Sequence, residues 1–194
     1  MVREGVPLVQ HQRHLFQVHL VPKLKGPRQW NPHVRVQGGG AGVGANTVSL
    51  PLEHSFLSGG ANGIRGWRLR ELGPGNLNPA DANLVVNGLG DVQFMASLEW
   101  RSSWNSPWDL AWFVDAGNVW LHGENAPSVT TWGETIWGSV AVGSGVGIRY
   151  DFEVVVLRLD AGLRVHDPVQ VAGKRWLGQR PGRGALHLGV GMPF

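Results

Sequence analysis

Apolar and polar residues alternate along much of this 194-residue chain. In the clearest run, Val92 to Arg101, the apolar face carries Phe94, Leu98 and Trp100, and the other face is polar. A period of two residues is typical of β-strands. Similar alternation covers 110–120, 140–150, 155–166 and 186–192, and a looser form covers 14–24 and 33–37. The pattern therefore predicts about seven strands and an all-β fold.

The connections between these runs alternate in length. Short ones lie at 25–29, 102–107 and 151–153, and long ones lie at 43–90, 121–137 and 167–183. Short turns at one end and long loops at the other are typical of antiparallel transmembrane β-barrels of the outer membrane.

The two faces of the runs also favour a barrel. The polar face carries Arg, Asp, Glu, His and many Gly residues, which suits the wet lumen of a barrel better than the solvated face of a soluble sandwich. The apolar face would then contact lipid. The residues predicted to face lipid are Phe94, Leu98, Trp112, Val114, Val146, Leu157, Leu159 and Leu188, and the alternation puts Trp120 on the same face.

The amino-acid composition narrows the possible classes of protein. The chain has 29 Gly and 10 Trp residues and only 16% charged residues. Trp at this density indicates an interfacial belt, although a soluble Trp-rich β-sandwich binding module would show it too. The chain has no run of ~18 apolar residues, so a transmembrane helix is not predicted. The formal charge of +3 is dispersed, which indicates a basic lumen and no nucleic-acid partner.

The longest connection contains a distinctive stretch, LPLEHSFLSGGANGIRGWRLRELGPG, at residues 50–75. Its glycines, which include Gly59, Gly60 and Gly66, allow a folded-back loop of specific shape that presents Arg65. The stretch closely resembles the loop motif of the BamA/TamA-type outer-membrane assembly factors, the bacterial surface antigen barrels. The core of that motif is V/I-R-G-F/Y, and here it is Ile64-Arg65-Gly66-Trp67, with Trp at the aromatic position.

The resemblance implies a site for the arginine. In the family, this residue reaches into the barrel and meets acidic residues on the two strands that follow. Glu99 in ASLEWR and Asp115 in FVDAGNVW match those strand motifs, so we expect both to be lumen partners of Arg65. A cation inside a lumen needs such partners because an unpaired buried charge costs several kcal/mol.

The chain ends in an alternating segment, 186–194, that closes on Phe194. This resembles the carboxy-terminal insertion signal of outer-membrane barrels, although Pro193 stands where a polar residue is usual. Met1 leads into polar sequence without the apolar segment of a signal peptide. An exported barrel needs one, so either the barrel interpretation is wrong or residues 1–194 are a fragment. We expect a fragment: the carboxy-terminal part of an outer-membrane barrel domain. Family barrels have roughly sixteen strands and carry periplasmic transport-associated domains before them.

The function that the resemblance implies is folding and insertion of β-barrel proteins, or translocation of polypeptides, in the bacterial outer membrane. The implied partners are outer-membrane lipid, unfolded outer-membrane proteins and periplasmic accessory proteins. Two alternatives share such a barrel: a two-partner secretion transporter and the barrel anchor of a patatin-like lipase.

An enzyme is not predicted. Ser55 and Ser58 lie near His54, but no G-x-S-x-G motif is present. The chain has no Cys, and its amino-terminal His residues lack the companions of a zinc site. The Gly-rich run 143–147 lies within a predicted strand, so a dinucleotide loop is not indicated. We therefore expect no catalytic residue, metal or cofactor.

Overall fold

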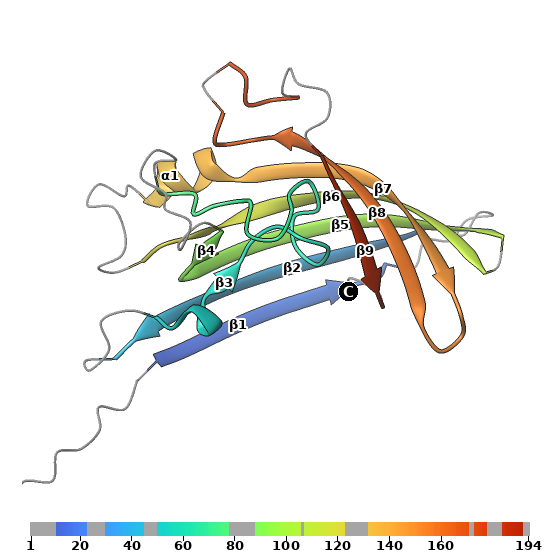
Figure 1. Ribbon diagram of the computed structural model, residues 1–194, viewed down its shortest axis with the longest axis horizontal. Helices are drawn as coiled ribbons and strands as arrows, with labels where there is room; N and C mark the ends of the chain where they lie inside the picture. The colour runs from blue at the N-terminus through green and yellow to red at the C-terminus, as the bar shows by residue number, and fades with distance from the viewer. Residues whose placement is uncertain are drawn as a thin grey trace, which may run out of the picture.

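The computed structural model describes residues 11–22, 30–44, 50–77, 88–105, 107–122, 132–170, 173–177 and 184–191. Within these residues one antiparallel sheet of seven strands dominates the fold, in the order β1-β2-β5-β6-β7-β8-β9 (Figure 1). Each strand pairs with the next long strand along the chain, as in an up-and-down barrel wall. The strands are β1 (His11–Leu20), β2 (Trp30–Val43), β5 (Val92–Asn105), β6 (Trp108–Trp120), β7 (Ala141–Asp151), β8 (Val156–His166) and β9 (Gly184–Val190).

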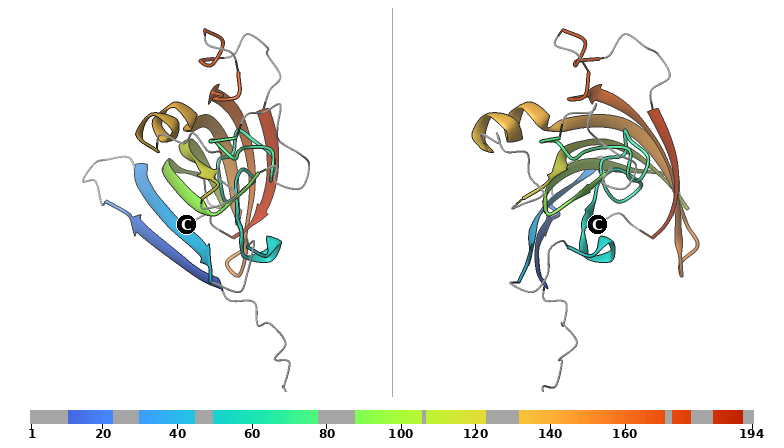
Figure 2. Two further views of the ribbon diagram at one scale, coloured as in Figure 1. Left: turned by 90° about the vertical axis from the view of Figure 1, so that its left-hand side faces the viewer. Right: turned by 60° about the vertical axis from the view of Figure 1, so that its left-hand side comes forward.

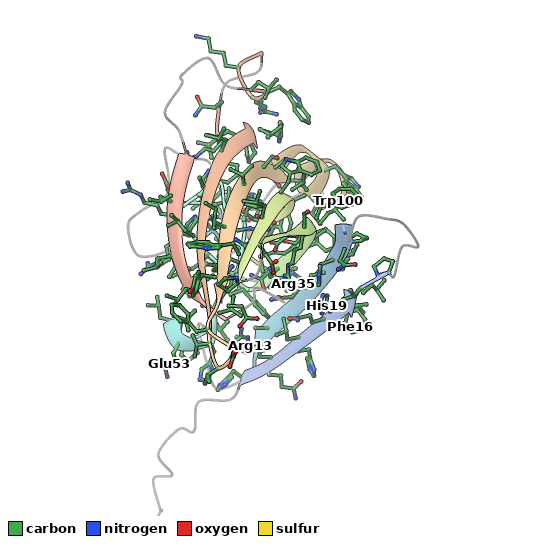
Figure 3. All side chains as sticks on the ribbon, turned by 90° about the vertical axis from the view of Figure 1, so that its right-hand side faces the viewer. Arg13, Phe16, His19, Arg35, Glu53 and Trp100 are labelled. Carbon is green, nitrogen blue, oxygen red and sulfur yellow. The ribbon has the colours of Figure 1, made fainter. Side chains whose placement is uncertain are left out.

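The sheet is curved, and the connection between β2 and β5 folds against its concave face (Figure 2). Convex-face side chains are largely exposed, including Phe94, Trp112, Val146 and Leu159, whereas Ser97, Glu99, Phe113 and Asp115 on the concave face are buried. Viewed from the end with the short turns, Arg35 lies toward the centre of the arc of strands and Phe16 lies at its margin (Figure 3). The predicted alternation of faces is therefore confirmed.

Short elements lie within the long connections, where the sequence predicted only loops. The β2–β5 connection contains a 3-10 turn (η1, Leu52–His54) and a two-stranded sheet of β3 (Phe56–Leu57) and β4 (Leu89–Gly90). Two-residue strands are too short to show a period. The connection after β6 contains helix α1 (Trp132–Ser139), whose eight residues are likewise too few for a clear helical pattern. No helix in the described part of the chain is long and apolar enough to cross a membrane.

Several strand boundaries differ from the prediction. Strand β1 begins and ends earlier than the predicted run 14–24, and Leu24 lies outside the described residues. Strand β2 does not stop at Gly38-Gly39-Gly40 but continues to Val43, and its residues 34–43 pair with β1. Of these glycines, Gly39 makes room for the inserted loop, since a Cβ there would lie 2.6 Å from the Phe56 ring.

The predicted lipid-facing position of Trp120 is wrong. Its side chain is only 1% exposed, and its indole Nε1 donates to Ser139 Oγ at 2.8 Å. The alternation of β6 breaks beside Gly117, after which Asn118, Val119 and Trp120 are all buried. Trp67 is also buried, in a cluster that the inserted loop forms with the sheet. Among the Trp residues whose burial the structure describes, Trp67 and Trp120 therefore belong to the interior and not to an interfacial belt.

Candidate functional site

The loop that carries Arg65 has a fixed conformation. Its two arms are joined by backbone hydrogen bonds from Arg70 N to Ser58 O at 2.8 Å and from Gly60 N to Trp67 O at 2.9 Å. Gly59 has a φ of +77°, and a Cβ there would lie 2.2 Å from the Arg68 carbonyl oxygen. The tip is thus a closed hairpin of defined shape that only glycine permits at this position.

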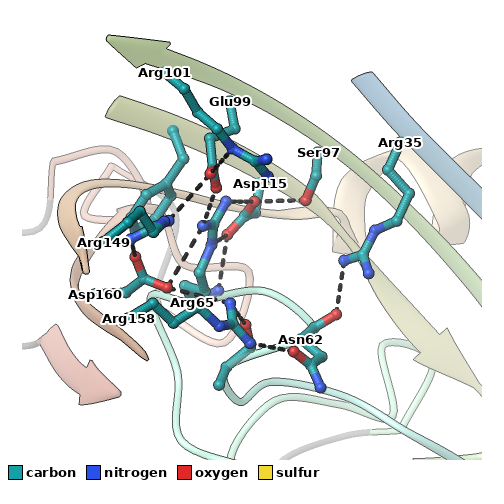
Figure 4. Close-up of polar contacts among 12 residues, drawn as sticks. Arg35, Asn62, Arg65, Ser97, Glu99, Arg101, Asp115, Arg149, Arg158 and Asp160 are labelled. Atoms are coloured by element: carbon teal, nitrogen blue, oxygen red, sulfur yellow. Dashed lines mark hydrogen bonds and ion pairs between the residues drawn. The ribbon is translucent and has the colours of Figure 1, made fainter. Parts of the chain in front are cut away.

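The Arg65 side chain contacts the two predicted carboxylates. Nε and Nη2 donate to Asp115 Oδ2 and Oδ1 at 2.8 and 2.9 Å, which is a bidentate pair, and Nη1 donates to Glu99 Oε2 at 2.5 Å. The Arg65 backbone N–H adds a bond to Asp115 Oδ2 at 3.0 Å. Bidentate Arg–carboxylate contacts are strong and directional. Arg65 is only 1% exposed, and both carboxylates are fully buried (Figure 4).

The guanidinium also stacks on an aromatic ring. Its Cζ lies 3.5 Å from the centre of the Phe113 ring, on the same strand as Asp115. Arg combines such a cation–π contact with bidentate hydrogen bonding better than Lys does, because the guanidinium group is planar and has several N–H donors. Ser97 Oγ donates to Asp115 Oδ1 at 2.6 Å and so orients the acceptor.

Further arginines from neighbouring strands complete the network. Arg101 Nε and Arg149 Nη2 both donate to Glu99 Oε1, at 2.7 and 3.1 Å. Arg149 Nη1 also donates to Asp160 Oδ1 at 2.5 Å, and Asp160 Oδ2 lies 3.7 Å from Arg65 Nη1. Residues of β5, β6, β7 and β8 are thereby connected to the loop through one buried network of charges. Removing one member of such a network is costly because it leaves the others unpaired.

The loop backbone is bound to the sheet as well. Arg158 Nη1 donates to Ala61 O at 3.0 Å and its Nη2 to Asn62 Oδ1, while Arg35 Nη2 donates to Asn62 O at 2.6 Å. On β9, His187 Nε2 lies 3.0 Å from the Arg65 carbonyl oxygen. The loop therefore contacts strands from β2 to β9, across most of the concave face.

Two glycines allow the close approach of the loop tip to β7 and β8. A Cβ on Gly162 would lie 2.1 Å from the Arg65 carbonyl oxygen, and a Cβ on Gly66 would lie 3.0 Å from Leu163 O. Position 162 therefore requires glycine for steric reasons while the loop is docked, whereas a Cβ at position 66 would need a small shift of the neighbouring β8 backbone.

A second tether lies toward the long-loop end of the sheet. Arg164 of β8 donates to Glu71 Oε1 through Nη2 and to Gly66 O through Nε at 3.3 Å, and its Cζ lies 5.0 Å from the Trp67 ring. Burial alone would raise the pKa of Glu71, but bonds from the Arg68 backbone N–H and the Arg164 guanidinium hold that pKa below its ordinary value. Glu71 is partly exposed, so this tether is weaker than the Arg65 network.

The sequence-predicted residues have different outcomes. The structure brings Arg65, Glu99 and Asp115 together, with Gly59, Gly60, Ile64, Gly66 and Trp67 buried around the loop tip. Phe194, the predicted insertion signal, lies outside the described residues. Among the described residues, no group of three or more His, Cys, Asp or Glu side chains is placed to hold a metal ion.

Other members of the network were not named as partners from the sequence. These are Arg35, Asn62, Ser97, Arg101, Arg149, Arg158, Asp160 and His187. Arg149, Arg158 and Asp160 lie at the polar positions of the alternating runs 140–150 and 155–166, so the alternation itself was the signal that they face inward. Contacts from β2 and β9 depend on the curvature of the sheet, which the sequence does not reveal.

Comparison with known proteins relates this arrangement to a family. Residues 19–180 match the family model described as the Omp85 superfamily domain. The fold is similar to a structure titled "The crystal structure of BamA from Haemophilus ducreyi lacking POTRA domains 1-3", with a TM-score of 0.59 and 13% identity over 92% of this chain. The match covers 34% of that chain, so the present chain spans about a third of its length. A comparison with curated proteins gave no significant match.

Proposed function

Because the chain belongs to the Omp85 superfamily, we propose that it is the carboxy-terminal part of a barrel that folds and inserts other outer-membrane proteins. Its location is the bacterial outer membrane, and its fold is the antiparallel barrel wall of the BamA/TamA type. At the level of the family, its role is in the insertion or transport of outer-membrane proteins. To the complete protein we assign the insertion of unfolded barrel proteins, with no chemical reaction.

The observation that carries the proposal is the buried anchoring of Arg65 by Asp115 and Glu99. The anchored loop braces the concave face, since it also contacts strands near both ends of the sheet, Arg35 on β2 and His187 on β9. A brace of this kind would keep a barrel wall in shape while one of its seams opens. The seam would be the place where a substrate strand pairs by β-augmentation.

The sheet itself supports a role in a larger barrel. Among the described strands, β1 and β9 each have one edge without a strand partner in the sheet. Unpaired strand edges in lipid leave backbone groups unsatisfied at several kcal/mol each, so further strands are needed to complete the wall. We propose that these strands, and the periplasmic domains expected from the family, belong to the same complete protein.

Reconstitution of the complete barrel in vesicles tests the proposal. The rate at which an unfolded outer-membrane protein becomes folded and protease-resistant in these vesicles should exceed the rate in empty vesicles. Arg65→Ala should reduce that rate, whereas Arg68→Ala, on the exposed side of the same loop, should leave it nearly unchanged. Export of one soluble polypeptide without any gain in barrel insertion would favour a two-partner secretion transporter instead. No effect on either process would favour a barrel that serves only as an anchor.

A further inference from the structure

The turn between β7 and β8 exposes apolar side chains where a polar turn is usual. In Phe152-Glu153-Val154-Val155, Val154 is 91% exposed, Phe152 54% and Val155 42%. The turn lies at the opposite end of the sheet from α1 (Figure 1). Short turns of bacterial outer-membrane barrels lie on the periplasmic side.

The turn continues the lipid-facing surface of the two strands. Phe152 follows Tyr150 and Ile148 on the convex face, and Val155 precedes Leu157 and Leu159 on the same face. The buried residues Arg149 and Arg158 have the opposite parity. No polar residue separates the lipid-facing surface from the apolar side chains of the turn on this face.

Aromatic rings cluster beside the β7–β8 turn, at the same level along the strands. The Trp108 and Tyr150 rings meet edge to face with centroids 4.6 Å apart, and the Tyr150 and Phe152 centroids are 4.4 Å apart. Trp and Tyr are enriched at the level of the lipid headgroups. Because Phe152 belongs to this cluster, the turn is at most a few residues from the interface.

The length of β8 along the membrane normal limits how far the β7–β8 turn can extend into water. Strands rise ~3.3 Å per residue and tilt ~40°, so each residue spans ~2.5 Å of the membrane normal. A ~25 Å apolar band therefore needs about ten residues, which is the stretch from Val155 to about Val165. If the turn stood two residues further into water, the Asp167–Gln170 turn at the other end of β8 would enter the hydrocarbon.

The turn backbone is suited to this environment. Phe152 N donates to Val155 O at 3.0 Å, Glu153 N to Asp151 Oδ1 at 2.7 Å, and Asp151 N to Pro107 O at 3.0 Å. Three N–H groups are thus satisfied within the protein, as a low-water environment requires.

We propose that the β7–β8 turn is a lipid-binding element, inserted into the interface of the periplasmic leaflet. Phe152, Val154 and Val155 contact the upper acyl region of phospholipids, and Glu153 faces the headgroups and water. The turn thereby anchors the β7–β8 hairpin, which carries Arg149, Arg158 and Asp160 of the loop network, at a defined depth. This role concerns lipid contact and does not depend on insertion activity.

Single cysteines test the proposal, because this chain has none of its own. Val154→Cys would be made in a cysteine-free form of the complete barrel, labelled with an environment-sensitive fluorophore and reconstituted in phosphatidylethanolamine–phosphatidylglycerol vesicles. Quenching would be measured with phospholipids brominated near the headgroup and, separately, with aqueous iodide. Leu159→Cys on the lipid-facing strand surface and Glu53→Cys, whose side chain is 81% exposed, are the matched controls.

We expect brominated lipid to quench the label at 154 at least half as strongly as at 159, and iodide to quench it much less than at 53. Val155→Cys should behave in the same way, which guards against a local effect of one substitution. Iodide quenching at 154 equal to that at 53, without lipid quenching, would overturn the proposal. In that case the turn is in water, and its apolar residues would instead be a docking surface for a periplasmic protein.

Discussion

His187 of β9 donates a hydrogen bond from its ring Nε2 to the backbone carbonyl of Arg65 at 3.0 Å, and so joins an edge strand of the described sheet to the inserted loop. A carbonyl oxygen can only accept, so this ring nitrogen carries the proton. His187 also lies opposite Asp160 in the β8–β9 register, next to the charged network. The position of the loop tip and the pairing of β9 are therefore coupled through one side chain.

Substitution of His187 should loosen this coupling. We expect His187→Ala to speed protease cleavage within 59–66 and to weaken β9 pairing, at a cost of about 1 kcal/mol for one neutral hydrogen bond. His187→Gln, which retains a donor, is the control and should recover part of the protection. Hydrogen exchange of the β9 amides measures the second effect. Unchanged exchange in His187→Ala would show that the contact does not couple loop and strand.

The close approach at Gly162 gives a steric prediction. A methyl group on this residue would lie 2.1 Å from the Arg65 carbonyl oxygen, so Gly162→Ala should displace the loop tip without removing any charge. We expect destabilisation of about 1–3 kcal/mol, as for overpacking elsewhere. Gly42→Ala, where a Cβ meets nothing within 4 Å, is the matched control. Urea unfolding of the complete barrel, followed by Trp fluorescence, compares the two; equal stabilities would contradict the docked position of the loop.

Lipid contact predicts an asymmetry between two exposed leucines. Leu159 lies on the convex face of β8 and Leu69 lies on the inserted loop, and both are partly exposed. Arg at a mid-bilayer outward site costs about 2–4 kcal/mol, whereas a lumen site tolerates charge. Leu159→Arg should therefore lower the free energy of unfolding in vesicles by about that amount, and Leu69→Arg should have little effect. Similar losses for both variants would mean that β8 does not face lipid as described.

The Glu71–Arg164 tether should respond to pH. The pKa of Glu71 is lowered in the folded state, so its contribution to stability is complete above the ordinary Glu pKa of about 4.3 and is lost as pH falls through the lower folded value. Hydrogen exchange of the Arg68 amide, which donates to Glu71 Oε2 at 2.9 Å, is the measurement. Wild type should be better protected than Glu71→Gln at neutral pH, and the difference should disappear in acid. A difference that persists at low pH would argue against a charged tether.

Much of the wall could be predicted from the sequence because lipid on one side and a charged lumen on the other impose a strict period of two. This alternation predicted the face of the sheet on which Phe94, Leu159 and Asp160 lie. The family resemblance predicted Glu99 and Asp115 as the partners of Arg65. Trp120 was predicted to face lipid, but Ser139 at the end of α1 and Gly75 of the inserted loop cover its indole, and the alternation along β6 does not reveal which distant segments pack on its end.

The wider network was harder to predict for a different reason. Arg35 and His187 lie 27 and more than 100 residues from the loop residues that they contact, and only the curved sheet brings them together. Short elements such as β3 and α1 were missed because their few residues carry no measurable period.

The coupling energy between positions 65 and 115 measures how strongly Arg65 anchors the inserted loop to the sheet. Arg65→Ala, Asp115→Asn and the double variant would be compared in the complete barrel by loop protection and by free energy of unfolding. Breaking a buried pair can cost about 3–5 kcal/mol, and water in the lumen should reduce this value. We expect a coupling of at least about 1 kcal/mol, with faster cleavage at 59–66 in both single variants. A coupling near zero, with loop protection unchanged in either single variant, would contradict the claim that Arg65 anchors the loop.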